Sequence, residues 1–188
     1  ETSLSHSFQI YGSSNITVDN VHVDGPHNIG SGNEKALFMV RNSSNVTVSN
    51  SEFSNLAHGI TALDNTGLVV KNNYFHDIRV DGFRGGGNSN LTIEQNVFTD
   101  FYPAKGDHPD AIQLWATNTT VSAEHITISD NLIVRGDGSP MQGIFIRNAD
   151  GNLPFKDLHI TGNMVAGGLY HGIAVEGAVG LEIRDNNV

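Results

Sequence analysis

Pairs of apolar residues separated by one position recur along the chain, and an Asn stands three positions after each pair. In two earlier copies the Asn, at Asn20 and Asn50, stands one residue closer to the apolar pair. The five later copies keep one register although their Asn residues are 23, 35, 32 and 23 positions apart. Alternation with period two predicts β-strands, and the fixed motif with variable spacing predicts a repeat that absorbs insertions in its turns. These five copies are Leu68/Val70/Asn73, Leu91/Ile93/Asn96, Ile126/Ile128/Asn131, Leu158/Ile160/Asn163 and Leu181/Ile183/Asn186.

A second pattern follows each first one, and it consists of a small residue, an apolar residue, any residue and another apolar residue. A third apolar position lies just beyond each Asn. Two or three strands in a repeat of about 23 residues predict an all-β fold, a right-handed parallel β-helix of about seven coils. The second pattern begins at Ala36-Leu37, Gly59-Ile60, Gly82-Phe83, Ala111-Ile112, Gly143-Ile144 and Gly172-Ile173, and the third positions are Val21/Val23, Phe53, Phe75, Phe98, Ile133 and Val165.

Asn at one turn position in successive coils predicts a ladder in which each side-chain amide bonds to the next and satisfies turn backbone. Leucine-rich repeats need a longer Leu-rich consensus, and propeller blades are longer and carry their own signature. We therefore expect residues 1–188 to form a single β-helix domain. Both ends are abrupt, so we expect one or both caps to be lacking. The chain is then a fragment of a longer β-helix protein, or it stacks on a partner or on itself.

Composition and charge narrow the classes of function. The chain has no Cys, which excludes disulfides and thiolate metal sites. Its net charge of -10 disfavours nucleic-acid binding, and no apolar run is long enough to cross a bilayer. We expect neither nucleic acid nor membrane as a partner. A polyanionic glycan would also be repelled at long range unless a local basic cluster or bound cations overcame the field.

Stacking the second pattern aligns polar residues into outward columns. His58, Asp81, Asp110, Gln142 and His171 fall in one column at the strand starts. Arg84 and Gln113 share the next column, and Trp115, Arg147 and Glu176 share a further one. Neighbouring strands lie about 4.8 Å apart, so Asp81 and Asp110 are expected to share a cation, a proton or a sugar hydroxyl. The loop from Phe101 to Asp110, rich in titratable residues, precedes the central strand of this stack.

These features resemble the pectate-lyase-like superfamily of polysaccharide lyases, mannuronan C5-epimerases, polygalacturonase-type hydrolases and tailspike depolymerases over essentially the whole chain. Mannuronan epimerases carry Asp-Pro-His-Glu near a Tyr and a Lys. Asp107-His108-Pro109-Asp110 with Tyr102 and Lys105 is similar in composition, in a different order. Asp81-Gly82-Phe83 and His171-Gly172-Ile173 look like pieces of polygalacturonase motifs. The double Asp and the Arg-Ile-Lys of those hydrolases are missing.

The resemblance and the aligned columns together predict an extracellular or cell-surface enzyme acting on an acidic, uronate-containing polysaccharide by β-elimination or C5-epimerisation. His108 or Lys105 is the expected base, Tyr102 an expected acid, and Asp107 and Asp110 complete the catalytic set. Asp81 and Asp110 either hold Ca²⁺ or bind the substrate carboxylate through a protonated member. Two alternatives stay open, a polygalacturonase-type glycoside hydrolase and a non-enzymatic glycan-binding or structural solenoid. The expected substrate-binding residues are Asp81, Arg84, Gln113, Trp115, Gln142, Arg147 and His171.

Overall fold

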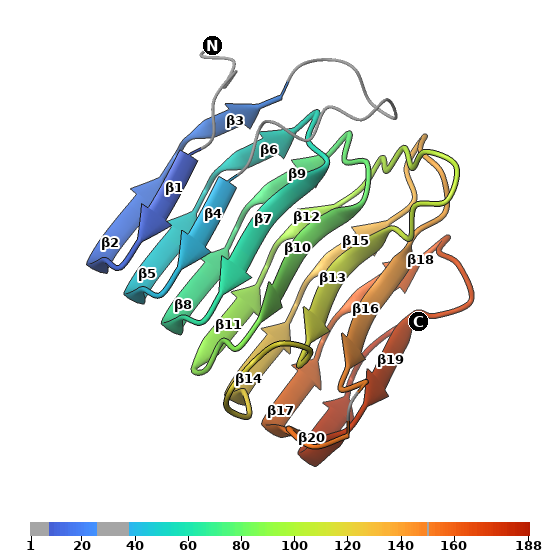
Figure 1. The fold of residues 1–188 in the computed structure, drawn as a ribbon. Coiled ribbons are helices and arrows are strands. Elements are labelled where there is room, and N and C mark those ends of the chain that lie inside the picture. The colour runs from blue at the N-terminus through green and yellow to red at the C-terminus, as the bar shows by residue number, and fades with distance from the viewer. Residues whose placement is uncertain (1–7, 26–37, 150) are drawn as a thin grey trace.

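Three parallel sheets wind around a common axis in the computed structural model, which describes residues 8–25, 38–149 and 151–188 (Figure 1). The first sheet contains β1 (Phe8–Tyr11), β4 (Phe38–Arg41), β7 (His58–Leu63), β10 (Asp81–Gly86), β13 (Asp110–Trp115), β16 (Gln142–Arg147) and β19 (Ile173–Glu176). The second sheet contains β2 (Ser14–Asp19), β5 (Ser44–Ser49), β8 (Thr66–Lys71), β11 (Leu91–Glu94), β14 (Glu124–Ser129), β17 (Phe155–Thr161) and β20 (Ala178–Arg184). The third sheet contains β3 (His22–Asp24), β6 (Glu52–Ser54), β9 (Tyr74–His76), β12 (Val97–Phe98), β15 (Leu132–Val134) and β18 (Met164–Ala166).

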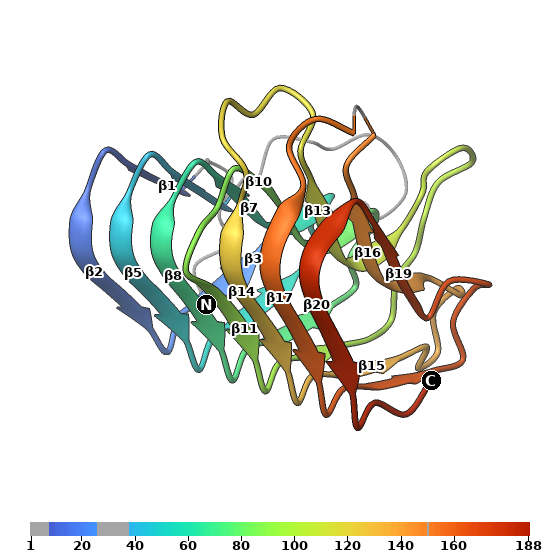
Figure 2. The same ribbon diagram turned by 90° about the horizontal axis from the view of Figure 1, so that it is seen from below.

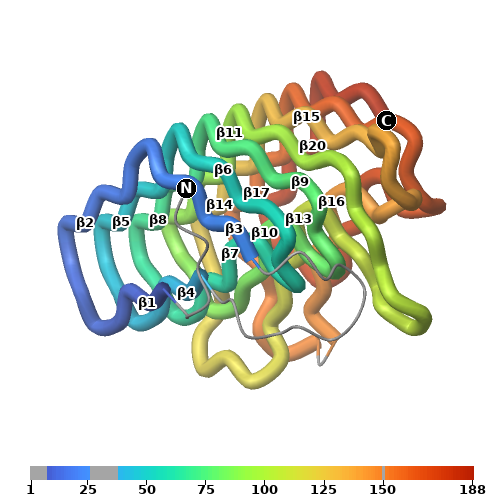
Figure 3. The backbone as a smooth tube through the Cα atoms, turned by 90° about the horizontal axis from the view of Figure 1, so that it is seen from above, coloured from blue at the N-terminus to red at the C-terminus, as the bar shows by residue number. Residues whose placement is uncertain are grey.

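Successive strands of each sheet come from successive coils, so every neighbour is parallel and one repeat away in sequence (Figure 2). Two sheets have seven strands and the third has six, which confirms the predicted parallel β-helix of about seven coils. The described residues form strands and turns without a helix. Insertions lie in the turns; the yellow-green segment between β12 and β13 extends beyond the neighbouring turns (Figure 3).

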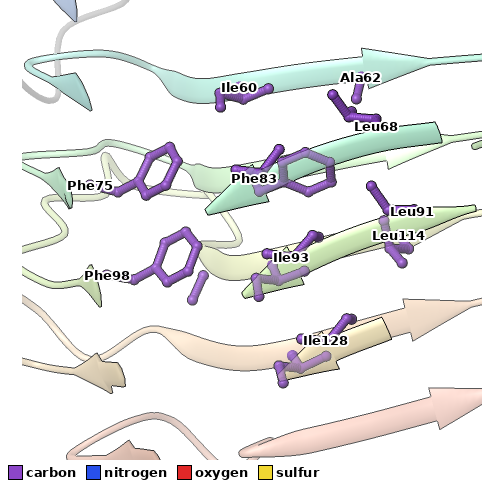
Figure 4. Close-up of a cluster of buried hydrophobic side chains, with 14 of the residues drawn as sticks. Ile60, Ala62, Leu68, Phe75, Phe83, Leu91, Ile93, Phe98, Leu114 and Ile128 are labelled. Carbon is purple, nitrogen blue, oxygen red and sulfur yellow. The ribbon is translucent and has the colours of Figure 1, made fainter. Parts of the chain in front are cut away.

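The apolar positions of all three patterns point inward and stack on their counterparts one coil away (Figure 4). Phe53, Phe75 and Phe98 of the third sheet are fully buried, and their rings stack with centroids 4.9 and 4.7 Å apart. Stacked rings of this kind add to the free energy gained from their burial. The aliphatic columns of the other two sheets pack against these rings, so the interior is one continuous hydrophobic core.

The predicted Asn ladder runs through the five later coils. From Asn73 to Asn186, each Asn donates two hydrogen bonds to Oδ1 of the Asn one coil later. One comes from its backbone N–H and one from its side-chain amide, at 2.9 to 3.0 Å. In the coil before Asn73 the ladder position belongs to Ser51, which donates its backbone N–H to Asn73, and in the first coil it belongs to Val21, whose N–H donates to the hydroxyl of Ser51. Asn20 and Asn50 stand outside it, at φ of 54° and 50°, where Asn is among the best tolerated residues. The shifted Asn of those copies is therefore a turn residue and not a displaced ladder residue.

A second ladder, which the sequence analysis missed, joins the turns between the first and second sheets. Asn65 donates its backbone N–H and side-chain amide to Oδ1 of Asn88, and Ser43 donates its backbone N–H to Asn65. Ser13 donates in turn to the hydroxyl of Ser43. Both Asn side chains are buried, so these bonds satisfy polar groups that would otherwise be costly.

The first copy of the second pattern lies one residue later in the chain than the sequence alignment predicts. Ala36 and Leu37 lie outside the described residues, but Met39 pairs with Thr61, whereas the predicted alignment placed it opposite Ala62. Phe38 is buried and takes the inward position, because its ring stacks on Phe8 and packs edge-on against Phe53.

The small residue of the second pattern faces the core. A Cβ at Gly59 would lie 2.6 Å from Cδ1 of Phe75, and one at Gly82 would lie 2.5 Å from Cδ1 of Phe98. The next residue of the pattern is also buried in the core, so two adjacent residues face inward and the strand is locally irregular. The residue before them, such as Asp81, is thereby brought to the same outer side as Arg84.

We predict that Asn96→Ala lowers the free energy of unfolding by about 3 kcal/mol, because it breaks buried hydrogen bonds and leaves backbone groups unpaired. Asn96 donates to the carbonyl of Val70 and to Asn131, and it accepts from Asn73. Urea unfolding followed by circular dichroism measures the change. Asn152 is exposed, and Asn152→Ala is the control. Equal urea midpoints for the two variants would contradict a stabilising role of the ladder.

Candidate functional site

The first outward column forms as the sequence predicts. Asp81 pairs in register with His58 on one side and Asp110 on the other, and Asp110 pairs with Gln142. His171 continues the column, since its carbonyl accepts from the N–H of the residue after Gln142. The four strands β7, β10, β13 and β16 thus place two adjacent carboxyl groups between the imidazole of His58 and the amide of Gln142.

Asp81 is buried between basic neighbours. Its side chain is 3% exposed, and its Oδ2 lies 3.1 Å from Nδ1 of His58 and 4.0 Å from a guanidinium nitrogen of Arg84. Arg84 also donates to the hydroxyl of Thr61 at 3.0 Å. Oδ1 of Asp81 is buried and has no hydrogen-bond partner among the described residues. One oxygen of this carboxyl group therefore lies beside His58 and Arg84, and the other makes no hydrogen bond to the described residues.

Asp110 has no exposed side-chain surface. Its Oδ2 accepts a hydrogen bond of 2.7 Å from Gln113 and lies 3.1 Å from Nδ1 of His108. Its Oδ1 is buried and lacks a hydrogen-bond partner in the described part of the chain. Burial, and next the negative charge of Asp81, raise the pKa of Asp110 to about 7 against the opposing effect of His108. Asp110 is therefore partly protonated near neutral pH.

His108 is the exposed end of this arrangement. Its side chain is 52% exposed, although the carboxyl group that it contacts is completely buried. The side-chain amide of Gln142 contacts both ring nitrogens, Nδ1 at 3.4 Å and Nε2 more closely. An imidazole with Nδ1–H toward Asp110 keeps Nε2 as its basic nitrogen. The ring is thus fixed by two buried side chains and open to solvent on one side.

The loop that carries His108 is anchored by Asp107. This carboxylate accepts two hydrogen bonds from Arg79, at 2.7 and 3.0 Å, and one from the backbone N–H of Ala104 at 2.8 Å. The bonds from Arg79 hold the pKa of Asp107 below its ordinary value. Asp107, expected among the catalytic residues, is occupied in holding the loop.

Tyr102 and Lys105 lie apart from this arrangement. The pKa of Tyr102 is raised by partial burial and next by Asp100, Asp77 and Asp137, which belong to turns beside the third sheet. Lys105 is exposed in a turn of the loop. Neither residue lines the hollows described next. The structure therefore brings His108, Asp110, Asp81, Gln113 and Gln142 together, without Tyr102 or Lys105.

Two adjoining hollows form a groove along the outer side of β13, β16 and β19, with volumes of about 340 and 270 Å³. Trp115 and Arg147 belong to its wall, as the third outward column predicts. The indole of Trp115 lies against Gly86, where a Cβ would be 2.7 Å from Nε1. The first hollow is lined by His108, Gln113, Leu114, Trp115, Phe145 and Arg147, and the second by Phe145, Ile146, Arg147, His171, Ala174, Val175 and Glu176.

Phe145 joins the two hollows and was missed by the sequence analysis. Its ring centroid lies 5.6 Å from that of His108 and 5.8 Å from that of His171, which in turn lies 4.5 Å from Tyr170. Phe145 occupies the same outward position of the repeat as Arg84 and Gln113. An aromatic residue at an outward position is the sequence feature that could have identified it as part of the groove.

The donor set around Asp81 and Asp110 falls short of a Ca²⁺ site. Ca²⁺ takes six to eight oxygen ligands, whereas imidazole, guanidinium and amide groups occupy Oδ2 of both carboxyl groups. The described residues contain no group of three or more His, Asp or Glu arranged to hold a metal ion.

A profile for the right-handed β-helix region matches residues 7–188. The chain belongs to this family. Membership in this family establishes the fold. It does not establish an activity, because parallel β-helices carry many functions, and the activity has to be inferred from the residues of the site. Comparisons with curated proteins and with solved structures find no match. A separate search of the described residues finds no helix suited to crossing a membrane.

The raised pKa of Asp110 predicts a specific dependence of stability on pH. This carboxyl group holds its proton up to about pH 7 in the folded protein and only to about 3.8, its ordinary value, when unfolded. The folded state binds more protons between these values, so this group's contribution makes the free energy of unfolding fall as the pH rises through them. Asp110→Asn removes that contribution, and we expect its urea midpoint, relative to wild type, to be higher at pH 8 than at pH 5.

The exposed Asp64→Asn serves as the control for this comparison, since its side chain lies away from the column. A difference between Asp110→Asn and wild type that stays constant from pH 5 to pH 8 would contradict the raised pKa of Asp110.

Proposed function

We propose that this β-helix protein is a carbohydrate-active enzyme that acts on a uronate-containing polysaccharide by β-elimination or C5-epimerisation. Both reactions begin with removal of the proton at C5, which requires a base in reach of the sugar ring. The observation that carries the proposal is the position of His108, which lines the groove with half its surface exposed while Asp110 holds it from below.

His108 has the surroundings of a general base. The carboxyl group of Asp110 accepts from Nδ1–H and orients the ring, in the manner of other His–Asp pairs. The amide of Gln142 contacts Nε2, so a bound substrate must displace this contact before the nitrogen can take a proton.

Arg147 supplies the charge that makes the C5 proton removable. Carbanion character at C5 is stabilised when a cation neutralises the adjacent carboxylate. Arg147 lines both hollows, is more than half exposed and lies 3.2 Å from Glu176. A substrate carboxylate would compete with Glu176 for the guanidinium. Arg84, engaged with Thr61 and Asp81, lies one column away and supports the buried pair.

In β-elimination, His108 takes the C5 proton, the C–H electron pair forms the C4=C5 double bond, and the C4–O bond breaks as the leaving oxygen takes a proton from solvent water. In epimerisation, removal of the C5 proton by His108 leaves a carbanion, which takes a proton from solvent water on the opposite face. Both routes leave the protein with a proton to return to solvent, and the exposed side of His108 offers that exit.

Burial of the acidic residues disfavours the hydrolase alternative. A glycoside hydrolase places two carboxyl groups on either side of the scissile bond. Asp81 and Asp110 are buried beneath the outer surface, Asp107 is bonded to Arg79, and Glu176 is paired with Arg147. His108 is an exposed titratable group of the groove without an exposed ion-pair partner such as Glu176 has, and its chemistry suits proton abstraction.

We predict that His108→Ala lowers the rate on a reactive uronate polymer by at least about 100-fold, and that Asp110→Asn lowers it by at least about tenfold, because base and orienting group are lost. The assay follows ultraviolet absorbance of unsaturated uronate and the NMR signals of the C5 configuration. His22→Ala, on the third sheet, is the control and should retain full activity.

The substrate panel should contain alginate, pectate, hyaluronan, gellan and xanthan. New reducing ends without unsaturation would instead select the hydrolase, and binding without any product would select the non-enzymatic solenoid. Full activity of His108→Ala would remove the basis of the proposal.

A further inference from the structure

The groove indicates how charge is distributed along its ligand. We propose that it binds an acidic heteropolysaccharide whose carboxylate-bearing sugars are separated by neutral sugars with apolar faces, and that a polymer charged at every residue fits poorly. The inference rests on the proposed function for the presence of a uronate, and it adds the pattern in which uronates occur.

The charges of the groove accommodate one carboxylate. Of the described residues that line the two hollows, Arg147 is the only Lys or Arg, and Glu176 lies 3.2 Å from it. The whole chain carries a net charge of -10, which adds a long-range repulsion for polyanions. Further carboxylates beside Arg147 would find no cation in the groove and would lose hydration without an ion pair.

The remaining surface of the groove suits neutral rings. Trp115 and Phe145 present aromatic surface on neighbouring strands, and Leu114 lies beside them. Gly86 leaves the space in which the indole of Trp115 lies. Such a wall, mainly apolar with few polar groups, is the usual form of a site that binds by ring stacking and orients by a single charge.

The cations of the outer side are separated along the axis. Arg84 stands on β10 and Arg147 on β16, in two different outward columns, and the strand between them, β13, presents Gln113 in the column of Arg84 and Trp115 in that of Arg147. Two strand spacings amount to about 10 Å, the length of about two extended sugar residues. A ligand lying along the axis therefore meets positive charge no more often than at every second sugar, with an aromatic surface between.

Binding assays test the charge pattern without requiring catalysis. Affinity electrophoresis with His108→Gln, which avoids consumption of the polymer, compares hyaluronan and gellan with polygalacturonate and polymannuronate at equal uronate concentration. We expect at least about tenfold tighter binding of hyaluronan or gellan at 0.15 M salt, where surface attraction is largely screened. Equal or tighter binding of the two homopolymers, or binding of none of the four, would overturn the inference.

Two variants separate the contributions of charge and stacking. Arg147→Gln should weaken binding of the preferred polymer to the level of its carboxyl-reduced form, whereas Trp115→Ala should weaken binding of both forms. Arg41→Gln and Tyr74→Ala are matched controls, because Arg41 lies on β4 of the same sheet and Tyr74 is an exposed aromatic residue of the third sheet. Losses of equal size in the controls would also overturn the inference.

The binding experiments can fail or succeed independently of the test for catalysis. A preference for separated carboxylates in a protein that forms no product would keep the binding inference and reject catalysis. Turnover of polygalacturonate or polymannuronate that depends on His108, with no preference in binding, would keep catalysis and reject the charge pattern.

Discussion

The structure depends on the exact vertical registration of parallel strands from one coil to the next. A slip of one residue would move every side chain of a strand to the opposite side of its sheet. Buried amides resist such a slip, because Asn96 and Asn131 each bond to the coil on either side and to turn backbone. Insertions between coils change the length of a turn but not this register. The groove can therefore combine residues from strands whose connecting chains differ in length.

The second requirement is the small residue near the start of β7, β10, β13 and β16. Gly82 lies against Phe98, and the close approach leaves no space for a larger side chain. This packing inside the core determines what is displayed outside, because two consecutive inward residues bring Asp81 beside Arg84. The aromatic column of the third sheet and the polar column of the first are thus two consequences of one local irregularity.

Periodic features could be predicted from the sequence, and contacts made by individual loops could not. The alignment of Asp81, Asp110 and Gln142 follows from the repeat alone, and the structure has the same register. The bond between Arg79 and Asp107 joins two turns of different length, β9 to β10 and β12 to β13, so the repeat does not predict it. Tyr102 is close to His108 in sequence, which suggests that both belong to the site. The loop instead places Tyr102 near acidic residues in the turns beside the third sheet.

Similar residues at one position of a solenoid have opposite consequences according to their chemistry. Stacked Asn or Phe residues gain from their neighbours, whereas stacked carboxylates about 4.8 Å apart repel one another, and burial increases that repulsion. The outer column avoids a run of like charges, since His58 and Gln142 flank the two acids and Asp110 keeps a proton near pH 7. That proton is a condition for packing two buried acids on adjacent strands. The same carboxyl group contacts His108, so the packing of the column and the orientation of the exposed imidazole are linked.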